Sequence, residues 1–292
     1  MFDRSWVAIV TPMHADGSVD LQAWARLLDL HRAQGTAGIV VGGTTGESAT
    51  LGDEELHELA MRACAQLRGQ VAVIAGAGGS STAATVARVR WLSELPIDGL
   101  LLVTPAYNRP AQEGLYRHFA AAAAAARRPI VLYNVPSRTA VDMKPATVAR
   151  LAQLAGIVGI KEAVPEAARV RELVESCPPH FAVLSGDDAT ARAAIAAGAR
   201  GVISVTANVA PAAMSEMVAA ALRHDAARAA QLDAPLSGLH RELFVEANPI
   251  PVKWLLSEMG LIGAGLRLPL TPLAPEHHAS VRAAARAAGV LS

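Results

Sequence analysis

Residues 71–75 read Val-Ala-Val-Ile-Ala, with an apolar side chain at every position. A strand that is exposed on one face alternates apolar and polar residues, whereas a parallel strand covered on both faces is apolar throughout. The pentapeptide therefore predicts a buried strand of a parallel sheet.

Seven more apolar, β-prone runs bounded by turn residues occur along the chain. They are residues 6–11, 38–42, 99–104, 130–134, 157–161, 181–185 and 201–205. The segments between the runs have helical spacing, most clearly where Leu21, Trp24, Ala25 and Leu28 share one face and Asp20 can cap the helix. Parallel neighbours need such crossover helices, and eight strands can close on an interior filled by side chains. The pattern predicts an α/β fold of the (β/α)8 TIM-barrel type.

A doubly wound open sheet is the alternative arrangement of alternating strands and helices. It favours a glycine-rich dinucleotide fingerprint after the first strand, but the sequence there is Val10-Thr11-Pro12-Met13. The glycine-rich residues 76–81 follow the third predicted strand and lack the last glycine of that fingerprint. The length of 292 residues also suits a single barrel, for which roughly 250 residues are typical.

The chain becomes wholly helical after the eighth run, which is more than closing a barrel requires. We expect residues 1–210 to form the catalytic barrel. We expect residues 211–292 to form the last barrel helix and a C-terminal helical extension, packed on the barrel without a flexible linker.

The charges balance, because Lys and Arg total 26 and Asp and Glu also total 26. A neutral chain gives no electrostatic reason to expect nucleic acid or an anionic membrane as a partner. The N-terminus has no secretory signal pattern, and every apolar run is shorter than the roughly 20 residues of a membrane span. Cys64 and Cys177 form neither a CxxC motif nor a disulfide framework. A cytoplasmic location is expected.

Ligands of (β/α)8 barrels bind at the C-terminal ends of the strands, so the residues that end each run are candidates. The glycine-rich residues 42–47, with Thr44 and Thr45, can bring backbone N–H groups and hydroxyls around a carboxylate or phosphate. Tyr133 ends the fifth run and can transfer protons, and Arg138 can clamp a carboxylate through two parallel hydrogen bonds. The simpler interpretations are a tight turn, a packing residue and a solvated loop charge.

Lys161 is the most specific candidate for a catalytic residue. It ends the run Ile157-Val158-Gly159-Ile160-Lys161, and the two-residue period of a strand puts it on the face of Ile157 and Gly159. A lysine in such apolar surroundings is expected to be partly desolvated, which favours the neutral amine. A neutral amine is the nucleophile that condenses with ketones to form a Schiff base. The alternative is a lysine that extends to solvent or pairs with a carboxylate.

Metal and hydrolase sites lack a complete motif. Asp187 and Asp188 follow the seventh run, but no histidine or third carboxylate is placed to complete a metal site. His277 and His278 are adjacent, and adjacent helix residues point about 100° apart. The sequence contains neither GxSxG nor HExxH. No metal and no cofactor are expected.

The candidate residues belong to longer motifs spread over nearly the whole chain. These are Val7–Met13, Gly43–Leu51, Thr104-Pro105 with Tyr107–Pro110, Tyr133–Thr139, Gly159–Ala163 and Asn248–Lys253. Together they resemble the dihydrodipicolinate synthase family of pyruvate-dependent class I aldolases and lyases.

The resemblance implies that Lys161 forms an imine with pyruvate, and that the derived enamine attacks the aldehyde of L-aspartate 4-semialdehyde. The product would be 4-hydroxy-tetrahydrodipicolinate, an intermediate of lysine and diaminopimelate biosynthesis. Tyr133 would relay protons with Thr44 and with Tyr107 from a neighbouring subunit. The imine is the electron sink, so no cofactor is implied. A homotetramer built as a dimer of dimers is implied as the assembly.

The resemblance also assigns the two substrate carboxylates. Thr45 would hold that of pyruvate, with backbone contacts from Gly186 and Ile203, and Arg138 would hold that of the semialdehyde. Two other functions stay open. One is a sister lyase that cleaves N-acetylneuraminate or sugar acids, although a polyol substrate calls for neutral groups rather than Arg138. The other is a barrel that binds a keto acid without turnover.

Lysine-inhibited bacterial members of this family have a feedback pocket made of Ser, Ala, two His, Asn, Glu and Tyr. The corresponding positions in this chain are Ser48, Ala49, Asp53, Leu56, Ser80, Ala84 and Ala106. Five of these seven residues differ, and the lost Glu, Asn and Tyr would have bound the charged groups of lysine. The departure predicts an enzyme that is little affected by lysine.

Overall fold

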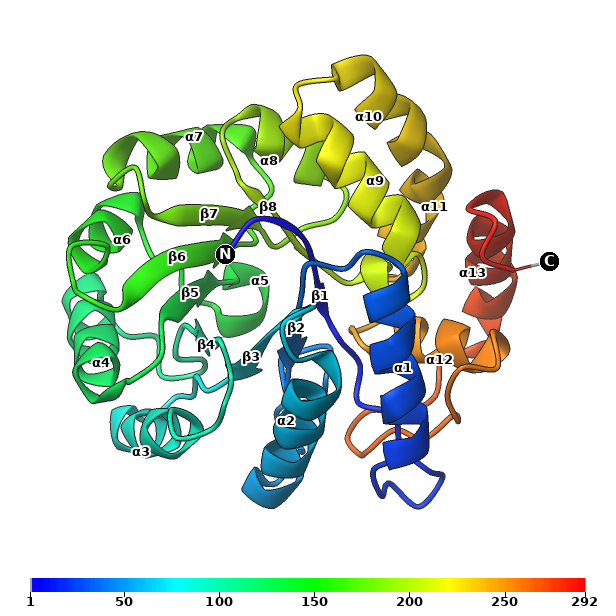
Figure 1. The fold of residues 1–292 in the computed structure, drawn as a ribbon, viewed down its shortest axis with the longest axis horizontal. Helices are drawn as coiled ribbons and strands as arrows, with labels where there is room; N and C mark the ends of the chain where they lie inside the picture. The colour runs from blue at the N-terminus through cyan, green and yellow to red at the C-terminus, as the bar shows by residue number, and fades with distance from the viewer. Residues whose placement is uncertain (1, 292) are drawn as a thin grey trace.

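The computed structural model describes residues 2–291 and contains a closed barrel of eight parallel strands in chain order (Figure 1). The strands are β1 Arg4–Ala8, β2 Gly38–Val41, β3 Ala72–Gly76, β4 Gly99–Val103, β5 Ile130–Asn134, β6 Ile157–Glu162, β7 Ala182–Ser185 and β8 Gly201–Ser204. The predicted (β/α)8 fold is therefore confirmed.

Helices surround the barrel and continue past its last strand. The barrel segment contains α1 Leu21–Ala33, α2 Asp53–Leu67, α3 Thr82–Leu92, α4 Gln112–Ala125, α5 Pro136–Thr139, α6 Pro145–Leu151, α7 Ala167–Ser176 and α8 Ala191–Ala196. The later part contains the 3-10 turns η1 Thr206–Asn208 and η2 Ala234–Leu236, and the helices α9 Pro211–Leu222, α10 Ala226–Asp233, α11 Ser237–Glu242, α12 Ile250–Glu258 and α13 Pro275–Ala287. No helix within residues 2–291 is both long and apolar enough to cross a membrane.

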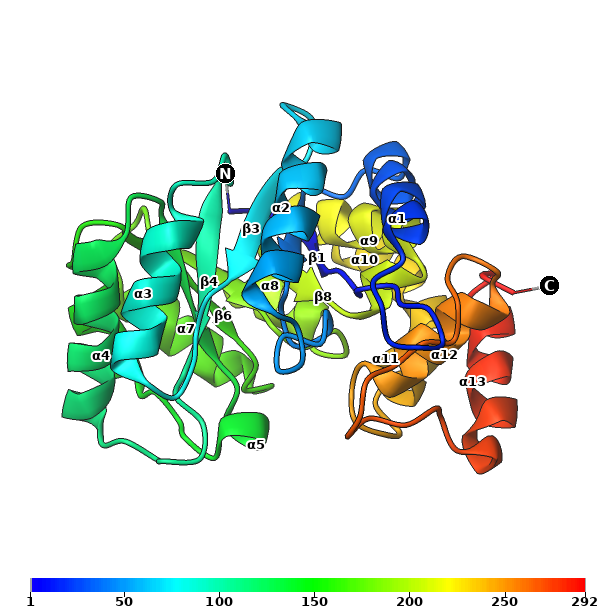
Figure 2. The same ribbon diagram turned by 90° about the horizontal axis from the view of Figure 1, so that it is seen from below.

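The C-terminal helices group on one side of the barrel. Helix α9 packs against β1, β8 and α8, so it takes the place of the last helix of the ring. Helices α11, α12 and α13 contact one another or the 3-10 turns and lie near α1 (Figures 1 and 2). The segment 244–248 before α12 reaches the barrel mouth, where it lines the cavity at the strand ends.

The core has two layers. One lies between the strands and the helices, and the other fills the barrel, where Trp6, Ile74, Leu184 and Ile203 are completely or almost completely buried. The ring of Trp6 fits because Gly38 has no side chain, since a Cβ there would lie 2.4 Å from the indole. The barrel is therefore filled at its base, and a cavity opens toward the C-terminal ends of the strands.

The first strand differs from its predicted bounds of 6–11, because β1 covers Arg4–Ala8. Ile9 and Val10 are buried beyond the strand ladder, and the backbone N–H of Val10 donates to Asn208 Oδ1 over 3.0 Å. A side chain satisfies this backbone group, so the apolar pattern continues after the strand has ended.

Candidate active site

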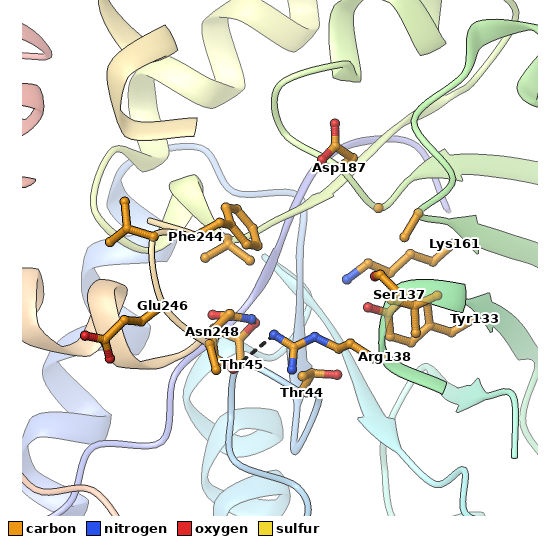
Figure 3. A pocket seen from close by; sticks show the side chains of 16 residues that line it. Thr44, Thr45, Tyr133, Ser137, Arg138, Lys161, Asp187, Phe244, Glu246 and Asn248 are labelled. Atoms are coloured by element: carbon orange, nitrogen blue, oxygen red, sulfur yellow. Dashed lines mark hydrogen bonds between the residues drawn. The ribbon is translucent and has the colours of Figure 1, made fainter. Parts of the chain in front are cut away.

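A cavity of about 530 Å³ opens at the C-terminal ends of the strands (Figure 3). It is lined by Thr44, Thr45, Tyr133, Val135, Ser137, Arg138, Lys161, Ala163, Gly186, Asp187, Val205, Phe244, Val245, Glu246, Ala247 and Asn248. Six of the eight predicted site residues are in this set. The other two, Tyr107 and Ile203, do not line the cavity.

Lys161 and Tyr133 come from neighbouring strands. They are partners in the register of β5 and β6, and the Lys161 Nζ lies 4.5 Å from the centroid of the Tyr133 ring. Both residues are buried, with 4% and 6% of their surfaces exposed. Lys161 lines the cavity beside the Tyr133 phenol. No carboxylate within residues 2–291 forms an ion pair with its amine.

Gly186 provides the space for this amine. A Cβ at position 186 would lie 3.0 Å from Lys161 Cε and 3.0 Å from Ala163 Cβ, closer than nearly all observed contacts of a Cβ. The backbone of Gly186 is also fixed, because its N–H donates to the carbonyl of Glu162 over 2.6 Å. Glycine at this position leaves the Lys161 side chain its room.

A polar network lies behind the two strands, on the face opposite the cavity. Asn134 Nδ2 donates to both carboxylate oxygens of Glu162 over 3.1 Å and to Asp142 Oδ1 over 3.0 Å. Arg169 pairs with Asp142 through both of its terminal nitrogens, and this holds the pKa of Asp142 well below its usual range. Burial raises the pKa of Glu162 to about 7, against hydrogen bonds from Val164 and Asn134. Because Asn134 and Glu162 directly follow Tyr133 and Lys161, this network fixes the strand ends that carry them.

The threonine turn, residues 42–47 with Thr44 and Thr45, forms another part of the cavity wall. Asn248 Nδ2 donates to Thr45 Oγ1 over 3.0 Å, and Arg138 Nη2 donates to the carbonyl of Asn248 over 3.1 Å. In Figure 3, Thr44 and Thr45 lie next to Arg138, while Asn248 and Phe244 lie across the cavity from Lys161 and Tyr133. Two hydroxyls and a guanidinium therefore converge opposite the amine.

The turn is anchored from behind by a buried ion pair. Lys253 on α12 pairs with Glu47, and both residues are at most 3% exposed. Burial lowers the pKa of Lys253, and the nearby Glu47 carboxylate acts in the opposite direction. The other Glu47 oxygen accepts from the backbone N–H of Arg267 over 3.2 Å. The C-terminal part of the chain thus fixes a turn of the barrel.

Tyr107 lies outside the cavity and is 96% exposed, with a φ of 70°. Its loop is held by Ser80, whose Oγ donates to the Ala106 carbonyl over 2.9 Å and whose carbonyl accepts from Asn108 Nδ2 over 2.9 Å. Ile203 is fully buried inside the barrel, below the cavity-lining Val205. One chain by itself does not bring either residue to the cavity.

No sequence pattern predicts a role for the segment 244–248, which forms one wall of the cavity. Asn248 begins the motif 248–253, and this was the one signal that pointed to the segment. Asp187 does line the cavity, but no group of three or more His, Cys, Asp or Glu side chains within residues 2–291 is arranged to hold a metal ion.

The arrangement combines an amine without an ion-pair partner, a phenol, two hydroxyls and a guanidinium. An amine can add to a ketone, a phenol can donate and accept protons, and hydroxyls with a guanidinium can bind carboxylates. These groups suit the covalent capture of a small oxo acid.

Comparisons with known proteins agree with this chemistry. A model of the dihydrodipicolinate synthetase family matches residues 1–288. The chain is 53% identical to 4-hydroxy-tetrahydrodipicolinate synthase of Alkalilimnicola ehrlichii over 291 residues, covering 100% of both proteins. It superposes with a TM-score of 0.98 and 46% identity on a chloride-inhibited dihydrodipicolinate synthase of Acinetobacter baumannii complexed with pyruvate, covering 100% of both chains. A lysine-bound dihydrodipicolinate synthase of Cyanidioschyzon merolae gives a TM-score of 0.96 at 36% identity, covering 99% of both chains.

Proposed function

The chain belongs to the dihydrodipicolinate synthetase family, and from this membership we propose that it condenses pyruvate with L-aspartate 4-semialdehyde. The product is 4-hydroxy-tetrahydrodipicolinate, and the reaction is a lyase step of lysine and diaminopimelate biosynthesis. The observation that carries the proposal is the Lys161 amine, which faces a cavity beside Tyr133 with no ion-pair partner in the described chain.

The reaction begins when the Lys161 amine adds to the keto carbon of pyruvate, and loss of water leaves an imine. The imine withdraws electrons, so the pyruvate methyl group loses a proton and becomes the nucleophilic carbon of an enamine. This carbon bonds to the aldehyde carbon of the second substrate, whose oxygen takes up a proton. The amino group of that substrate then adds to the imine carbon, expels the lysine amine and closes the ring.

The proton transfers are assigned to Tyr133, Thr44 and Tyr107 of a second copy of this chain. Tyr133 is supported by its contact with Lys161, and Thr44 by its place on the cavity wall. Tyr107 is supported by its exposure, because a large aromatic side chain left in solvent is available to another subunit. We propose a homotetramer built from dimers, in which each dimer completes two sites.

The carboxylates of the substrates are assigned to opposite groups of the wall. Thr45 holds that of pyruvate. The backbone contacts expected from Gly186 and Ile203 are not part of the proposal, because the Gly186 N–H already donates to the Glu162 carbonyl and Ile203 does not line the cavity. Arg138 holds that of the semialdehyde, and its bond to the Asn248 carbonyl keeps the guanidinium at the cavity. A cation suits a carboxylate better than it suits a polyol chain, which favours this reaction over those of the sister lyases.

A coupled assay with pyruvate and aspartate semialdehyde tests the proposal. Lys161→Ala is expected to lower kcat by about 10⁴-fold or more, because the covalent route is lost. Arg138→Ala is expected to raise the KM for the semialdehyde by about 10- to 100-fold, the effect of one charge-assisted contact, while the KM for pyruvate changes little. Faster cleavage of N-acetylneuraminate than condensation of the semialdehyde would favour the sister lyase. Binding of pyruvate without turnover would favour a keto-acid sensor.

We further propose that lysine affects this enzyme little. A second cavity of about 420 Å³ lies beside the site, lined in part by Ser48, Ala49, Ser80 and Arg88. Its one charged lining residue is Arg88, which pairs with Asp53 over 2.6 Å. Arg88 is thus already compensated by Asp53, and no carboxylate lines the cavity to attract the amino groups of lysine. Half-inhibition by submillimolar lysine in the same assay would contradict this proposal.

A further inference from the structure

Asn248 contacts both of the groups that the proposed function assigns to substrate carboxylates. Its side-chain Nδ2 donates to Thr45 Oγ1 over 3.0 Å, and its backbone carbonyl accepts from Arg138 Nη2 over 3.1 Å. The residue is 6% exposed and lines the cavity just before α12. It therefore connects the turn after β2, helix α5 and the C-terminal segment at one point of the wall (Figure 3).

The bond to Thr45 fixes the direction in which its hydroxyl donates. A threonine hydroxyl has one proton and two lone pairs, so it can donate once. Here the amide N–H occupies a lone pair of Thr45 Oγ1, and the hydroxyl proton stays free for another acceptor. An ionised carboxylate can only accept, so it needs a hydroxyl whose proton is free in this way.

We propose that Asn248 is a positioning residue, which directs the hydroxyl proton of Thr45 toward the carboxylate of the 2-oxo acid. This inference rests on the proposed function, because it takes Thr45 as the group that binds that carboxylate. It assigns a task in the reaction to the C-terminal extension, which supplies the amide from outside the barrel strands.

The contacts around Asn248 allow its effect on the Thr45 hydroxyl to be tested apart from any effect on the structure of the cavity wall. Thr45 is the side-chain partner of Asn248, and Asn248 Oδ1 is buried without a hydrogen-bond partner within residues 2–291. The contact with Arg138 uses the backbone carbonyl, which every substitution at position 248 keeps.

The turn itself is held by other groups. Thr11 Oγ1 donates to the Gly46 carbonyl over 2.8 Å, and Lys253 pairs with Glu47. Changing the Asn248 side chain therefore alters the Thr45 hydrogen bond while these anchors of the backbone stay in place.

Kinetics of Asn248→Asp and Asn248→Ala, each in the wild-type and Thr45→Val backgrounds, test the proposal. A carboxylate at 248 takes the Thr45 proton for itself, so Asn248→Asp is expected to raise the KM for pyruvate by about 10-fold or more. Asn248→Ala only frees the hydroxyl to rotate and is expected to raise this KM by about 3-fold. In the Thr45→Val background, Asn248→Ala is expected to change the KM by less than about 1.5-fold, because the hydroxyl that it acts on is gone.

Gln112→Ala is the matched control. Gln112 Oε1 accepts from Thr147 Oγ1 over 2.6 Å, so this variant also removes an amide that is bonded to a threonine, but outside the cavity. It should leave the KM for pyruvate unchanged. Melting temperatures establish that each variant is folded, and Asn248→Ala carries the test alone if the Asp variant does not fold.

An unchanged KM for pyruvate in folded Asn248 variants would overturn the proposal. So would an Asn248→Ala effect of the same size with and without the Thr45 hydroxyl. Borohydride reduction separates this failure from that of the proposed function. If pyruvate is trapped on Lys161 of the wild type but trapping in Asn248→Asp needs no more pyruvate, only the role of Asn248 is wrong. If the wild type traps no pyruvate, the proposed function itself is wrong.

Discussion

Two buried lysines near the cavity have different surroundings. Lys161 lines the cavity, whereas Lys253 lies behind the threonine turn. Lys161 is 4% exposed on β6, and its Nζ lies 4.5 Å from the Tyr133 ring with no ion-pair partner in the described chain. Lys253 is 2% exposed on α12 and pairs with Glu47. Burial alone therefore does not make a lysine a nucleophile. The amine without a carboxylate is available for chemistry, and the paired amine holds the threonine turn.

The cavity wall has two halves that are supported differently. The strand-borne half carries Tyr133 on β5 and Lys161 on β6, and the other half consists of the threonine turn and the segment before α12. The strand-borne half is fixed by the register of β5 and β6 and by the bonds of Asn134 to Glu162 on the outer face. The other half depends on long-range contacts from α12 and the segment before it. Substitutions can therefore disturb the two halves separately.

The largest effect is expected from Lys253→Met, which leaves Glu47 buried without its cation. Breaking such a pair by removing one partner costs about 3–5 kcal/mol of unfolding free energy. Lys161→Met leaves no carboxylate unpaired and should cost less than about 1.5 kcal/mol. Urea denaturation of both variants measures the difference. Adding Glu47→Gln to Lys253→Met should recover part of the loss, and equal losses for the two single variants would contradict the comparison.

Gly186→Ala is expected to disturb the strand-borne half. The new Cβ would lie 3.0 Å from Lys161 Cε, so the Lys161 side chain must shift by a few tenths of an ångström. A displacement of about 1 Å in a reacting group can lower kcat/KM by about 100-fold, and for this smaller shift we expect a loss of about 3- to 10-fold. Gly52→Ala is the control, because its Cβ would meet Glu55 Oε2 at an ordinary 3.6 Å. If Gly186→Ala keeps the wild-type kcat/KM, Lys161 does not need the space that glycine leaves at position 186.

The smallest effect is a pH trend in Glu162→Gln. The pKa of Glu162 is about 7 in the folded protein, above its ordinary 4.5, so folding disfavours the charged form. The stability that the neutral form contributes is complete below about pH 4.5 and is lost as the pH rises to about 7. Relative to the wild type, Glu162→Gln should therefore gain stability between these two pH values and level off above them.

Urea denaturation across this pH range checks the trend, with Glu216→Gln on an exposed position of α9 as the control. If the stability difference between Glu162→Gln and the wild type does not change with pH, folding does not disfavour the charged form of Glu162.

Sequence patterns alone predict the barrel and the strand-borne half of the site. Apolar runs locate the strands, and Lys161 lies beside its register partner Tyr133 at the barrel interior. The prediction that Ile157 shares the face of Lys161 is wrong, because Ile157 packs in the outer core layer. The register of β5 and β6 shifts between Ile130 and Val131, so the two-residue period holds only from Gly159 onward. The glycine-rich turn with Thr44 and Thr45 follows its strand directly, so it is found in the same way. These features depend on residues that are close together in the chain.

The remaining features depend on contacts that no local pattern encodes. Asn248 meets Thr45 across 203 positions of the sequence, and Lys253 meets Glu47 across 206. Lys253 could be identified as part of a motif, but its role requires knowing which carboxylate it meets. Tyr107 is exposed in one chain, so its assigned role depends on a second copy.

Borohydride reduction in the presence of pyruvate, followed by mapping of the modified peptide by mass spectrometry, tests the central claim most directly. The chain has three lysines, Lys144, Lys161 and Lys253. We predict that one reduced pyruvate is attached at Lys161, that Lys144 and Lys253 stay unmodified, and that Lys161→Ala shows no adduct. An unmodified Lys161, or an adduct on the paired Lys253, would contradict the claim that the lysine without a carboxylate partner is the one that captures the oxo acid.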